Sequence, residues 1–231
     1  APPGSGLGSS GALDVALVSA LIAARGETMD RAAIAHAAWR VEVEDAGVAG
    51  GKQDQYAAAL GGFLRLEFQG TAVRTASLAL DPQFVRHLER HLVICYTGSS
   101  RVSANMITRV MNGYERGDPV IVEALRGMKD VASSMITALH RSDVAAVGAL
   151  LSRNWHYQRQ LDPGMCTDMM ARLEKAVESA GVLGGKAAGA GAGGCMFFLA
   201  NSSPRAVGQA AVAAGARLLP ATLVGVGVRS W

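Results

Sequence analysis

PPGSGLGSSGAL, at residues 2–13, decides the fold, because it places a glycine-rich turn directly before an apolar helical pattern. Unpaired backbone N–H groups and the helix dipole both attract anions at a helix N-terminus. Glycines leave those N–H groups unshielded, and two serines add hydroxyls where the helix should begin. A flexible linker would have no reason to carry Leu7 and then lead into Leu13, Leu17 and Leu21. The segment therefore predicts a phosphate-binding loop.

Two better-known phosphate-binding motifs do not fit this segment. It lacks the GK[ST] ending of a P-loop, and no strand precedes it as a dinucleotide-binding fingerprint requires. The pattern Pro-x-x-x-Gly-Leu-Gly-Ser-Ser therefore needs another explanation.

Composition indicates a globular chain with reduced thiols. Of 231 residues, 50% are hydrophobic and 18% are charged, which excludes a disordered chain. The net charge of +3 is dispersed, so we expect no nucleic acid partner. No window approaches the roughly 18 to 20 apolar residues of a membrane helix. Cys95, Cys166 and Cys195 are far apart and odd in number, which favours a cytoplasmic protein without disulfides.

Hydrophobic periodicity predicts an α+β fold with strands on both sides of a helical middle. We expect helices at 9–25 and 28–46, the latter capped by Thr28, and a loop running into a short helix within 48–62. A hairpin at 63–78, a helix at 82–90 and a strand at 91–97 should follow. Four helical segments, broken at 117–119, 141–143 and 162–164, should fill about 102–181, and a glycine-rich stretch at 184–194 should precede a strand at 195–200. The pattern closes with a helix at 204–215 and a strand at 222–229.

The segment GGKQDQYAAALGGF at 50–63 carries a second chemical signal. Phosphoryl transfer to an alcohol needs positioning, charge neutralisation and a carboxylate near the attacking hydroxyl. Asp54 follows a glycine pair between two glutamines, which indicates a polar loop. The alternative is an N-cap for a helix that starts near Tyr56, and both roles can hold at once.

Four further features are candidates with structural alternatives. Glu42, twelve residues before Asp54, suits Mg²⁺, although most helix carboxylates are only solvated. ICYTGSSRVS at 94–103 ends a buried strand beside Arg101, which suits sugar or phosphate oxygens or is a surface residue. NWHYQRQL at 154–161 offers Trp155 as a core residue, and GGKAAGAGAGG at 184–194 is a close-approach loop or a linker.

Taken together, these motifs resemble the GHMP kinase superfamily of galactokinase, homoserine, mevalonate and phosphomevalonate kinases. The resemblance extends over essentially the whole chain and is strongest to the D-glycero-D-manno-heptose 7-phosphate kinases, with fucokinase-type domains nearby. Ala187, Ala188, Ala192 and Cys195 depart from the usual third loop. The resemblance implies a GHMP kinase fold, with an S5-like N-terminal region at 1–90 and a ferredoxin-like C-terminal region at 91–231.

The resemblance also implies roles for individual residues, with ATP between the glycine loops. Asp54 and Lys186 would be catalytic, and Ser10 and Glu42 would hold Mg²⁺. The ATP phosphates would be bound by Pro3, Gly4, Gly6, Leu7, Gly8, Ser9 and Ser10. The sugar would be bound by Gln53, Asp54, Tyr96, Thr97, Gly98, Arg101, Arg159, Gly189 and Gly191.

The activity implied is transfer of the γ-phosphate of MgATP to the anomeric hydroxyl of a heptose 7-phosphate. Alternatives are a kinase of L-fucose or galactose, or a non-catalytic homologue that binds sugar or nucleotide. A homodimer is possible on the same resemblance. Family members carry strands before the phosphate loop, so we expect the N-terminal strands to be missing from this chain. We also expect the 231 residues alone to be poorly soluble and inactive.

Overall fold

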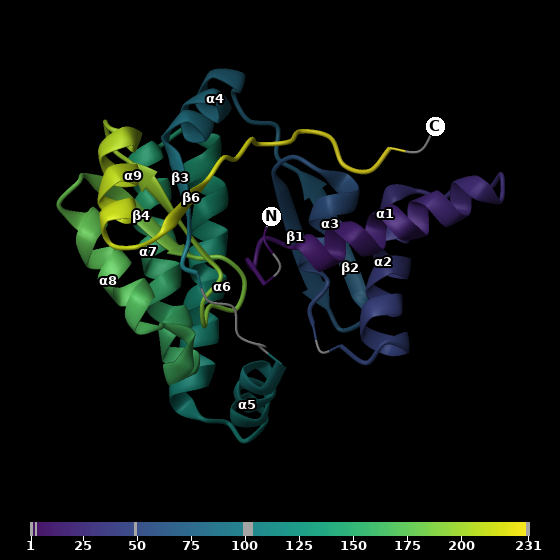
Figure 1. The fold of residues 1–231 in the computed structure, drawn as a ribbon. Helices are drawn as coiled ribbons and strands as arrows, with labels where there is room; N and C mark the ends of the chain where they lie inside the picture. Colours follow the sequence, from purple (N-terminus) through teal and green to yellow (C-terminus); the bar gives the residue numbers. More distant parts are fainter. Residues whose placement is uncertain (1, 3, 49, 99–103, 230–231) are drawn as a thin grey trace. The chain divides into compact units, whose positions relative to one another are not determined.

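A computed structural model of the chain describes residues 2, 4–48, 50–98 and 104–229 (Figure 1). The chain forms two compact units. The smaller unit contains Gly8–Ala79 and Leu223–Trp231, and the larger unit contains Ala1–Leu7 and Leu80–Thr222. The predicted division at residue 90 concerned family regions and stays a prediction. The boundaries of the compact units differ from this division. The N-terminal segment Ala1–Leu7 packs with the larger unit, and the C-terminal segment Leu223–Trp231 packs with the smaller one.

Three α-helices and a hairpin build the smaller unit. Its elements are α1 (Ser9–Ala24), α2 (Arg31–Arg40), a π-helical turn η1 (Val41–Asp45), α3 (Gln53–Leu60), β1 (Leu64–Gln69) and β2 (Ala72–Ser77). The helices share a core of aliphatic side chains and one tyrosine: Val15, Ile34, Ala35, Ala38, Tyr56 and Ala59. Leu66 and Val73 of the hairpin pack against this core.

The start of α2 differs from the prediction. Asp30 caps the helix by accepting a hydrogen bond from the Ala33 N–H at 3.0 Å, so the predicted cap at Thr28 is wrong. Asp is as good a cap as Thr, and only its position relative to the first turn decides between them. The predicted hairpin is confirmed, with Leu64 opposite Ser77 and Gln69 opposite Ala72.

The predicted final strand at 222–229 is wrong. Residues 223–229 form no strand and instead run along the end of α3, where the N–H groups of Gly227 and Val228 donate to Leu60 and Ala59 at 3.1 Å. These carbonyls belong to the last turn of α3, where no N–H group of the helix can donate to them. The segment therefore satisfies a helix end, and the alternation of its apolar residues does not place it in a sheet.

The larger unit joins a helical layer to a four-stranded antiparallel sheet in the order β4-β5-β3-β6. Its strands are β3 (Leu92–Tyr96), β4 (Val182–Ala187), β5 (Cys195–Ala200) and β6 (Arg217–Leu219). Its helices are α4 (Pro82–His91), α5 (Ala104–Glu115), α6 (Pro119–His140), α7 (Val144–Leu161), η2 (Pro163–Met165), α8 (Asp168–Glu178) and α9 (Pro204–Ala213). From β3 onwards, the strand order along the chain and in the sheet is that of a ferredoxin-like β-α-β-β-α-β fold with extra helices.

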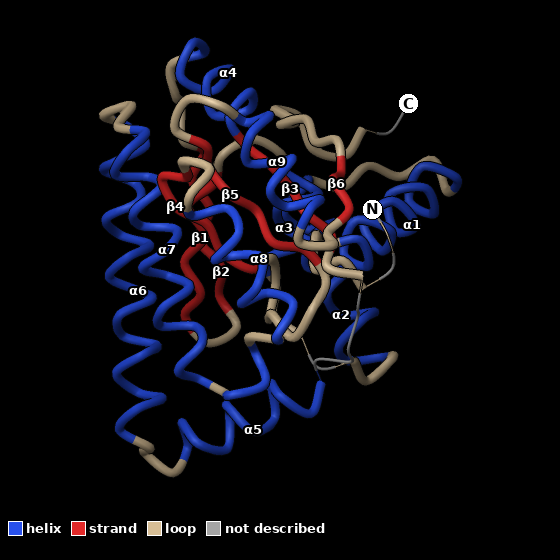
Figure 2. Tube along the Cα trace, turned by 60° about the vertical axis from the view of Figure 1, so that its left-hand side comes forward, coloured by secondary structure: helices blue, strands red, loops and turns tan. Residues whose placement is uncertain are grey.

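Helices α7, α8 and α9 contribute to the core on one face of this sheet (Figure 2). Trp155, Leu173 and Val207 from these helices meet Met196 and Phe198 of β5. Because side chains alternate along a strand, the neighbouring Phe197 points to the other face. The predicted breaks between the long helices are confirmed, since α6 and α7 begin at the caps Asp118 and Asp143.

The second glycine-rich stretch is partly a strand. Residues 184–187 belong to β4, and only 188–194 form the connecting loop, which we call the third loop. Gly185 and Phe198 are paired residues of β4 and β5, and a Cβ at Gly185 would lie 2.3 Å from that ring. Glycine here makes room for a core ring, so a glycine-rich composition need not mean a loop. Among the described residues, no helix has the length and apolar character needed to cross a bilayer.

Candidate active site

The smaller unit begins with a bare helix N-terminus. Gly8 is the N-cap residue of α1, with a φ of +70°, and no side chain caps the helix there. The first helical hydrogen bond runs from the Ala12 N–H to the Gly8 carbonyl at 3.0 Å. The N–H groups of Ser9, Ser10 and Gly11 therefore have no acceptor within the helix. Both serines are exposed, which leaves this turn open to an anion.

Asp54 lies against this helix start. A Cβ at Gly8 would be 3.2 Å from the Asp54 Cγ, and one at Gly11 would be 3.0 Å from the Asp54 Cβ. The absence of side chains at these two glycines lets the carboxylate approach the predicted phosphate loop. Asp54 is neither in a loop nor an N-cap, contrary to both predictions. It occupies the first turn of α3, whose N-cap is Lys52.

The environment of Asp54 favours its protonated form. Burial raises the pKa of the Asp54 carboxyl above its usual value, and the nearby Glu42 charge raises it further. A hydrogen bond from Gln53 opposes these two effects. A carboxylate whose pKa is raised is a stronger base once it is ionised, which suits it to accept a proton from an alcohol.

Glu42 is held by the same helix. The Gln55 amide, on α3, donates a hydrogen bond to the Glu42 carboxylate. Gln55 is only 1% exposed, and its own Oε1 has no partner. Glu44, by contrast, is exposed and pairs with Arg40 at 2.8 Å. Glu42 and Glu44 therefore have different partners, a buried amide and an exposed arginine. The metal-binding role of Glu42 stays a prediction.

Asp14 adds a carboxylate that the sequence analysis overlooked. It lies one turn after Ser10 on α1, and the Glu42 charge contributes to raising the pKa of its carboxyl, after the larger effect of burial. Two carboxylates and a serine hydroxyl therefore belong to neighbouring parts of one unit. This hard-oxygen donor set fits Mg²⁺, which takes few protein ligands and keeps water and phosphate as the others.

The first part of the predicted phosphate loop belongs to the larger unit, where it rests on the third loop. The Cys195 N–H donates to the Ser5 carbonyl at 2.8 Å, and Ser5 is 1% exposed. Gly6, with a φ of +74°, lies so close to the Ala188 carbonyl that a Cβ would be 2.7 Å from its oxygen. Gly194 approaches the carbonyls of Gly4 and Ser5 in the same way. Backbone contacts thus fix residues 4–6 on the third loop.

Lys186 is on β4 and not in the glycine loop where the sequence analysis expected it. Its amine donates to the carbonyl of Ala187 at 2.9 Å and lies 5.7 Å from the centre of the Phe197 ring. Burial lowers the pKa of this amine to about 8. The amine is therefore partly deprotonated near neutral pH, and its catalytic role stays a prediction.

The structure assigns specific contacts to several residues predicted to bind the sugar. The Thr97 hydroxyl and N–H both donate to the Gly194 carbonyl at 2.9 Å, so Thr97 anchors the third loop. Tyr96 lies beside the Arg217 guanidinium, 5.4 Å from its ring centre. Arg159 pairs with Glu174 at 3.1 Å and also lies over the Trp155 ring.

The remaining predicted residues are placed as follows. Gly189 and Gly191 are in the third loop, and Gly98 follows β3 with a φ of +81°. Leu7 is exposed at the end of the larger unit's terminal segment. Pro3 and Arg101 lie outside the described residues. None of these positions tests the predicted contacts with sugar or ATP.

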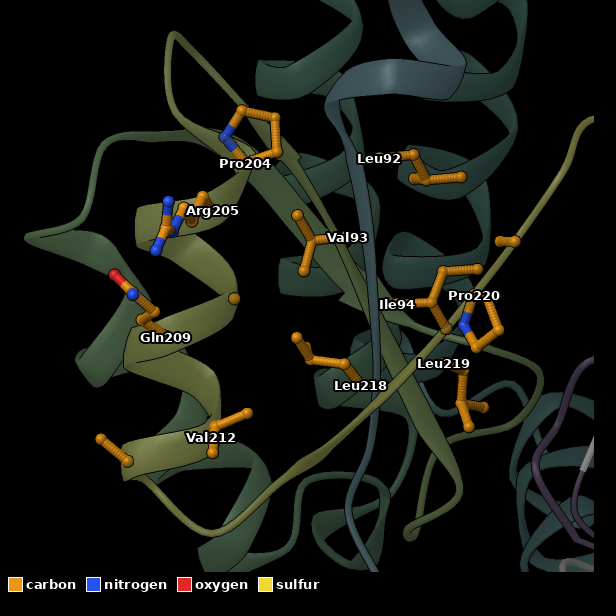
Figure 3. A pocket seen from close by; sticks show the side chains of 13 residues that line it. Leu92, Val93, Ile94, Pro204, Arg205, Gln209, Val212, Leu218, Leu219 and Pro220 are labelled. Atoms are coloured by element: carbon orange, nitrogen blue, oxygen red, sulfur yellow. The ribbon is translucent and has the colours of Figure 1, made fainter.

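An apolar cavity of about 750 Å³ lies beside β3, β6 and α9, away from these residues (Figure 3). Val93 and Leu218 lie between the strands and α9, and Arg205 and Gln209 are its polar lining residues. No predicted site residue lines it. This cavity therefore does not belong to the candidate active site.

Sequence comparison identifies two family domains in the chain. Residues 1–62 match the GHMP kinases N terminal domain, and residues 135–217 match the GHMP kinases C terminal domain. The chain is 33% identical over 205 residues to the D-glycero-alpha-D-manno-heptose 7-phosphate kinase of Campylobacter jejuni, which covers 88% of this chain and 60% of that protein. It is also 31% identical to the mevalonate kinase of Pyrococcus furiosus, over 93% of this chain and 61% of that protein.

A solved structure shows the same similarity. The D-glycero-D-manno-heptose 1-phosphate kinase from Bacteroides thetaiotaomicron superposes with a TM-score of 0.74 at 26% identity, covering 98% of this chain and 63% of that one. The chain thus spans about three fifths of the length of the relatives it matches. The α+β fold is confirmed by these comparisons and by the observed sheet.

Proposed function

Because the chain belongs to the GHMP kinase family, we propose that it transfers the γ-phosphoryl group of ATP to a hydroxyl of a sugar phosphate. The observation that carries this proposal is the contact of Asp54 with Gly8 and Gly11 at the start of α1. A base for the sugar hydroxyl and an anion-binding helix end lie side by side within one unit. Phosphoryl transfer needs these two features together.

The chain's own residues divide the work. The N–H groups at the start of α1 bind phosphate oxygens, since the dipole and the free donors both favour negative charge there. The ionised Asp54 carboxylate orients the sugar hydroxyl and takes its proton as the oxygen attacks the γ-phosphorus. The bond from that phosphorus to the β-phosphate oxygen breaks, and ADP leaves with the electron pair.

Ser10 and Glu42 would hold Mg²⁺, with Gln55 fixing the Glu42 carboxylate from inside the unit. Mg²⁺, when bound, neutralises charge on the nucleotide phosphates. Lys186 is proposed to be catalytic in its cationic form.

For the acceptor we propose D-glycero-D-manno-heptose 7-phosphate, phosphorylated on its anomeric hydroxyl to the 1,7-bisphosphate. The support is the 33% identity to a kinase of this sugar phosphate. Arg101 and Arg159 are proposed to bind the distal phosphate, because a guanidinium donates in pairs to phosphate oxygens. The relative that phosphorylates mevalonate and the fucokinase relative, at 28% identity, define the competing substrates.

A substrate panel tests the proposal. The complete natural enzyme is assayed for ADP release with heptose 7-phosphate, free mannose, L-fucose, galactose and mevalonate. We expect the heptose 7-phosphate to give the highest kcat/KM, and a product that carries its new phosphate on the anomeric carbon. Preference for fucose or mevalonate would overturn the substrate assignment. ATP binding without turnover on any of these acceptors would favour a non-catalytic homologue.

A further inference from the structure

Helix α7 backs β4 and the third loop along one of its faces. Gly148 lies against β4, where a Cβ at Gly184 would be 1.8 Å from the Gly148 carbonyl oxygen. One turn later, the Ser152 hydroxyl accepts a hydrogen bond from the Gly185 N–H at 3.1 Å. Trp155 follows on the same face and is 1% exposed. This spacing of four and then three residues brings Gln158 onto the same face next.

Gln158 reaches the third loop itself. Its amide Nε2 donates to the Gly189 carbonyl at 2.8 Å, and the side chain is 3% exposed. Gly189 in turn contacts the first glycine-rich segment, since a Cβ there would lie 3.2 Å from the Gly6 carbonyl oxygen. Two contacts therefore connect a buried glutamine on α7 to the predicted phosphate loop.

The other anchors of the third loop hold its later part. The Ala192 N–H donates to the Met165 carbonyl at 2.7 Å, and Thr97 holds the Gly194 carbonyl. The first half of the loop carries Gly189, which has a φ of +61°. In the first half of the third loop, the hydrogen bond from Gln158 to the Gly189 carbonyl connects the loop to α7.

We propose that Gln158 is a positioning residue for nucleotide binding, which holds Gly189 and, through it, Gly6. The inference rests on the nucleotide-binding part of the proposed function. Gln158 does not touch the phosphates in this account. It fixes the backbone of the third loop on which residues 4–6, the first part of the predicted phosphate loop, rest.

A matched pair of variants on α7 tests this role in the complete natural enzyme. Gln158→Met keeps the length of the side chain and removes the donor. Gln160→Met is the control, because Gln160 is exposed and its amide bonds to the exposed His156, at 2.9 Å, two residues after Gln158 on α7. We measure amide hydrogen exchange at Ala188, next to Gly189, and at Cys195, which donates to the Ser5 carbonyl, without ligand, and the Kd of ADP by calorimetry without sugar.

We expect faster exchange at both amides and about tenfold weaker ADP binding in Gln158→Met, which is the loss of one ordinary hydrogen bond. Gln160→Met should match the unchanged protein in both measurements. Unchanged exchange and unchanged ADP affinity in a folded Gln158→Met variant would overturn the inference. Failure of the unchanged protein to bind ADP would instead overturn the proposed function, and this inference with it.

Gln158→Glu keeps the test decisive if the methionine variant does not fold. A carboxyl at this buried position can donate to Gly189 only when protonated, and burial favours that form. ADP binding should therefore tighten from about pH 8 to about pH 6 relative to Gln160→Glu. A pH dependence that parallels this control would contradict the positioning role.

Discussion

The two glycine-rich stretches look alike in the sequence and do different work in the structure. The first, at residues 4–8, presents a bare helix N-terminus beside Asp54. The second, at 184–194, is half strand and half loop, and in its loop the Ala188 and Ala192 N–H groups and the Gly189 and Gly194 carbonyls bond to protein partners. The first stretch leads into N–H groups at the start of α1 that have no acceptor within the helix, and the second holds residues 4–6 through backbone contacts.

This difference shows what glycine supplies at each place. At Gly8 the missing side chain gives Asp54 access to the start of α1. At Gly6 it lets two backbone segments touch. Composition alone cannot distinguish these cases, because both need a residue without a Cβ. The partner of the glycine decides, and that partner is remote in the sequence.

The largest expected effect is that of Asp54→Asn on the first stretch. We expect turnover to fall by about 10²–10⁴-fold, the typical value of a general base, while ATP affinity is kept. Activity of the unchanged enzyme should also fall as the pH is lowered through the Asp54 pKa, which lies above its usual value. A coupled assay for ADP release measures both. Full turnover in the variant would remove Asp54 from the catalytic role.

The same substitution should not reduce stability at neutral pH. The raised pKa means that the native state binds the Asp54 proton more tightly than the unfolded state does. Ionised Asp54 therefore costs stability above its native pKa, and the neutral asparagine removes that cost. We expect an equal or higher Tm for Asp54→Asn at pH 7 by calorimetry.

Gly6→Ala breaks the contact between the two stretches. A methyl group would meet the Ala188 carbonyl at 2.7 Å, at a backbone φ of +74°. Gly26→Ala is the control, because its φ of +68° imposes similar backbone strain with nothing within 4 Å. We expect ADP affinity to fall by more than about tenfold only in Gly6→Ala, since each 1.4 kcal/mol is a factor of ten. Equal losses would mean that backbone strain alone matters.

Glu42→Gln tests the predicted Mg²⁺ site beside the first stretch, and we expect a smaller effect on the rate than from Asp54→Asn. It removes the charge that Gln55 positions, so the Mg²⁺ concentration for half-maximal rate should rise several-fold. Glu44→Gln should change it little, because Glu44 pairs with exposed Arg40. The reverse order would assign the metal to the other carboxylate.

Lys186→Met concerns the second stretch, and we expect it to change the pH dependence of stability. The native pKa of about 8 lies below the unfolded value of about 10.4, so the unfolded state binds more protons between them. Stability of the unchanged protein should therefore rise between about pH 8 and 10.4 relative to Lys186→Met. Denaturant unfolding measures this slope, with the exposed Lys175→Met as control. Parallel slopes in all three proteins would contradict the desolvation of Lys186.

Local patterns predicted most of the elements. The helix breaks at Asp118 and Asp143 and the strand at 195–200 carry their signals within a few residues, and all are confirmed. The strand predicted at 222–229 failed because its partner, the end of α3, lies about 170 residues earlier. Alternation of apolar residues cannot reveal such a partner.

The sequence motifs predicted the candidate site residues but not the residues that lie beside them or hold them in place. Asp54 and Glu42 came from recognisable segments, whereas Asp14 and Gln158 did not. Their signals are helical spacings, four residues after Ser10 and three after Trp155, and these matter only once the neighbouring elements are placed. Asp54 itself was assigned to a loop because its helix starts three residues earlier than Tyr56 suggests.

Amide NMR shifts on adding ADP test the central contrast between the two stretches most directly. In the complete natural enzyme without sugar, we predict the largest shifts at the N–H groups of Gly8, Ser9 and Ser10, with smaller ones at Gly189 and Gly191. Large shifts at residues 188–194 together with unchanged signals at residues 8–10 would contradict the account, because the second stretch would then be the one that binds the phosphates.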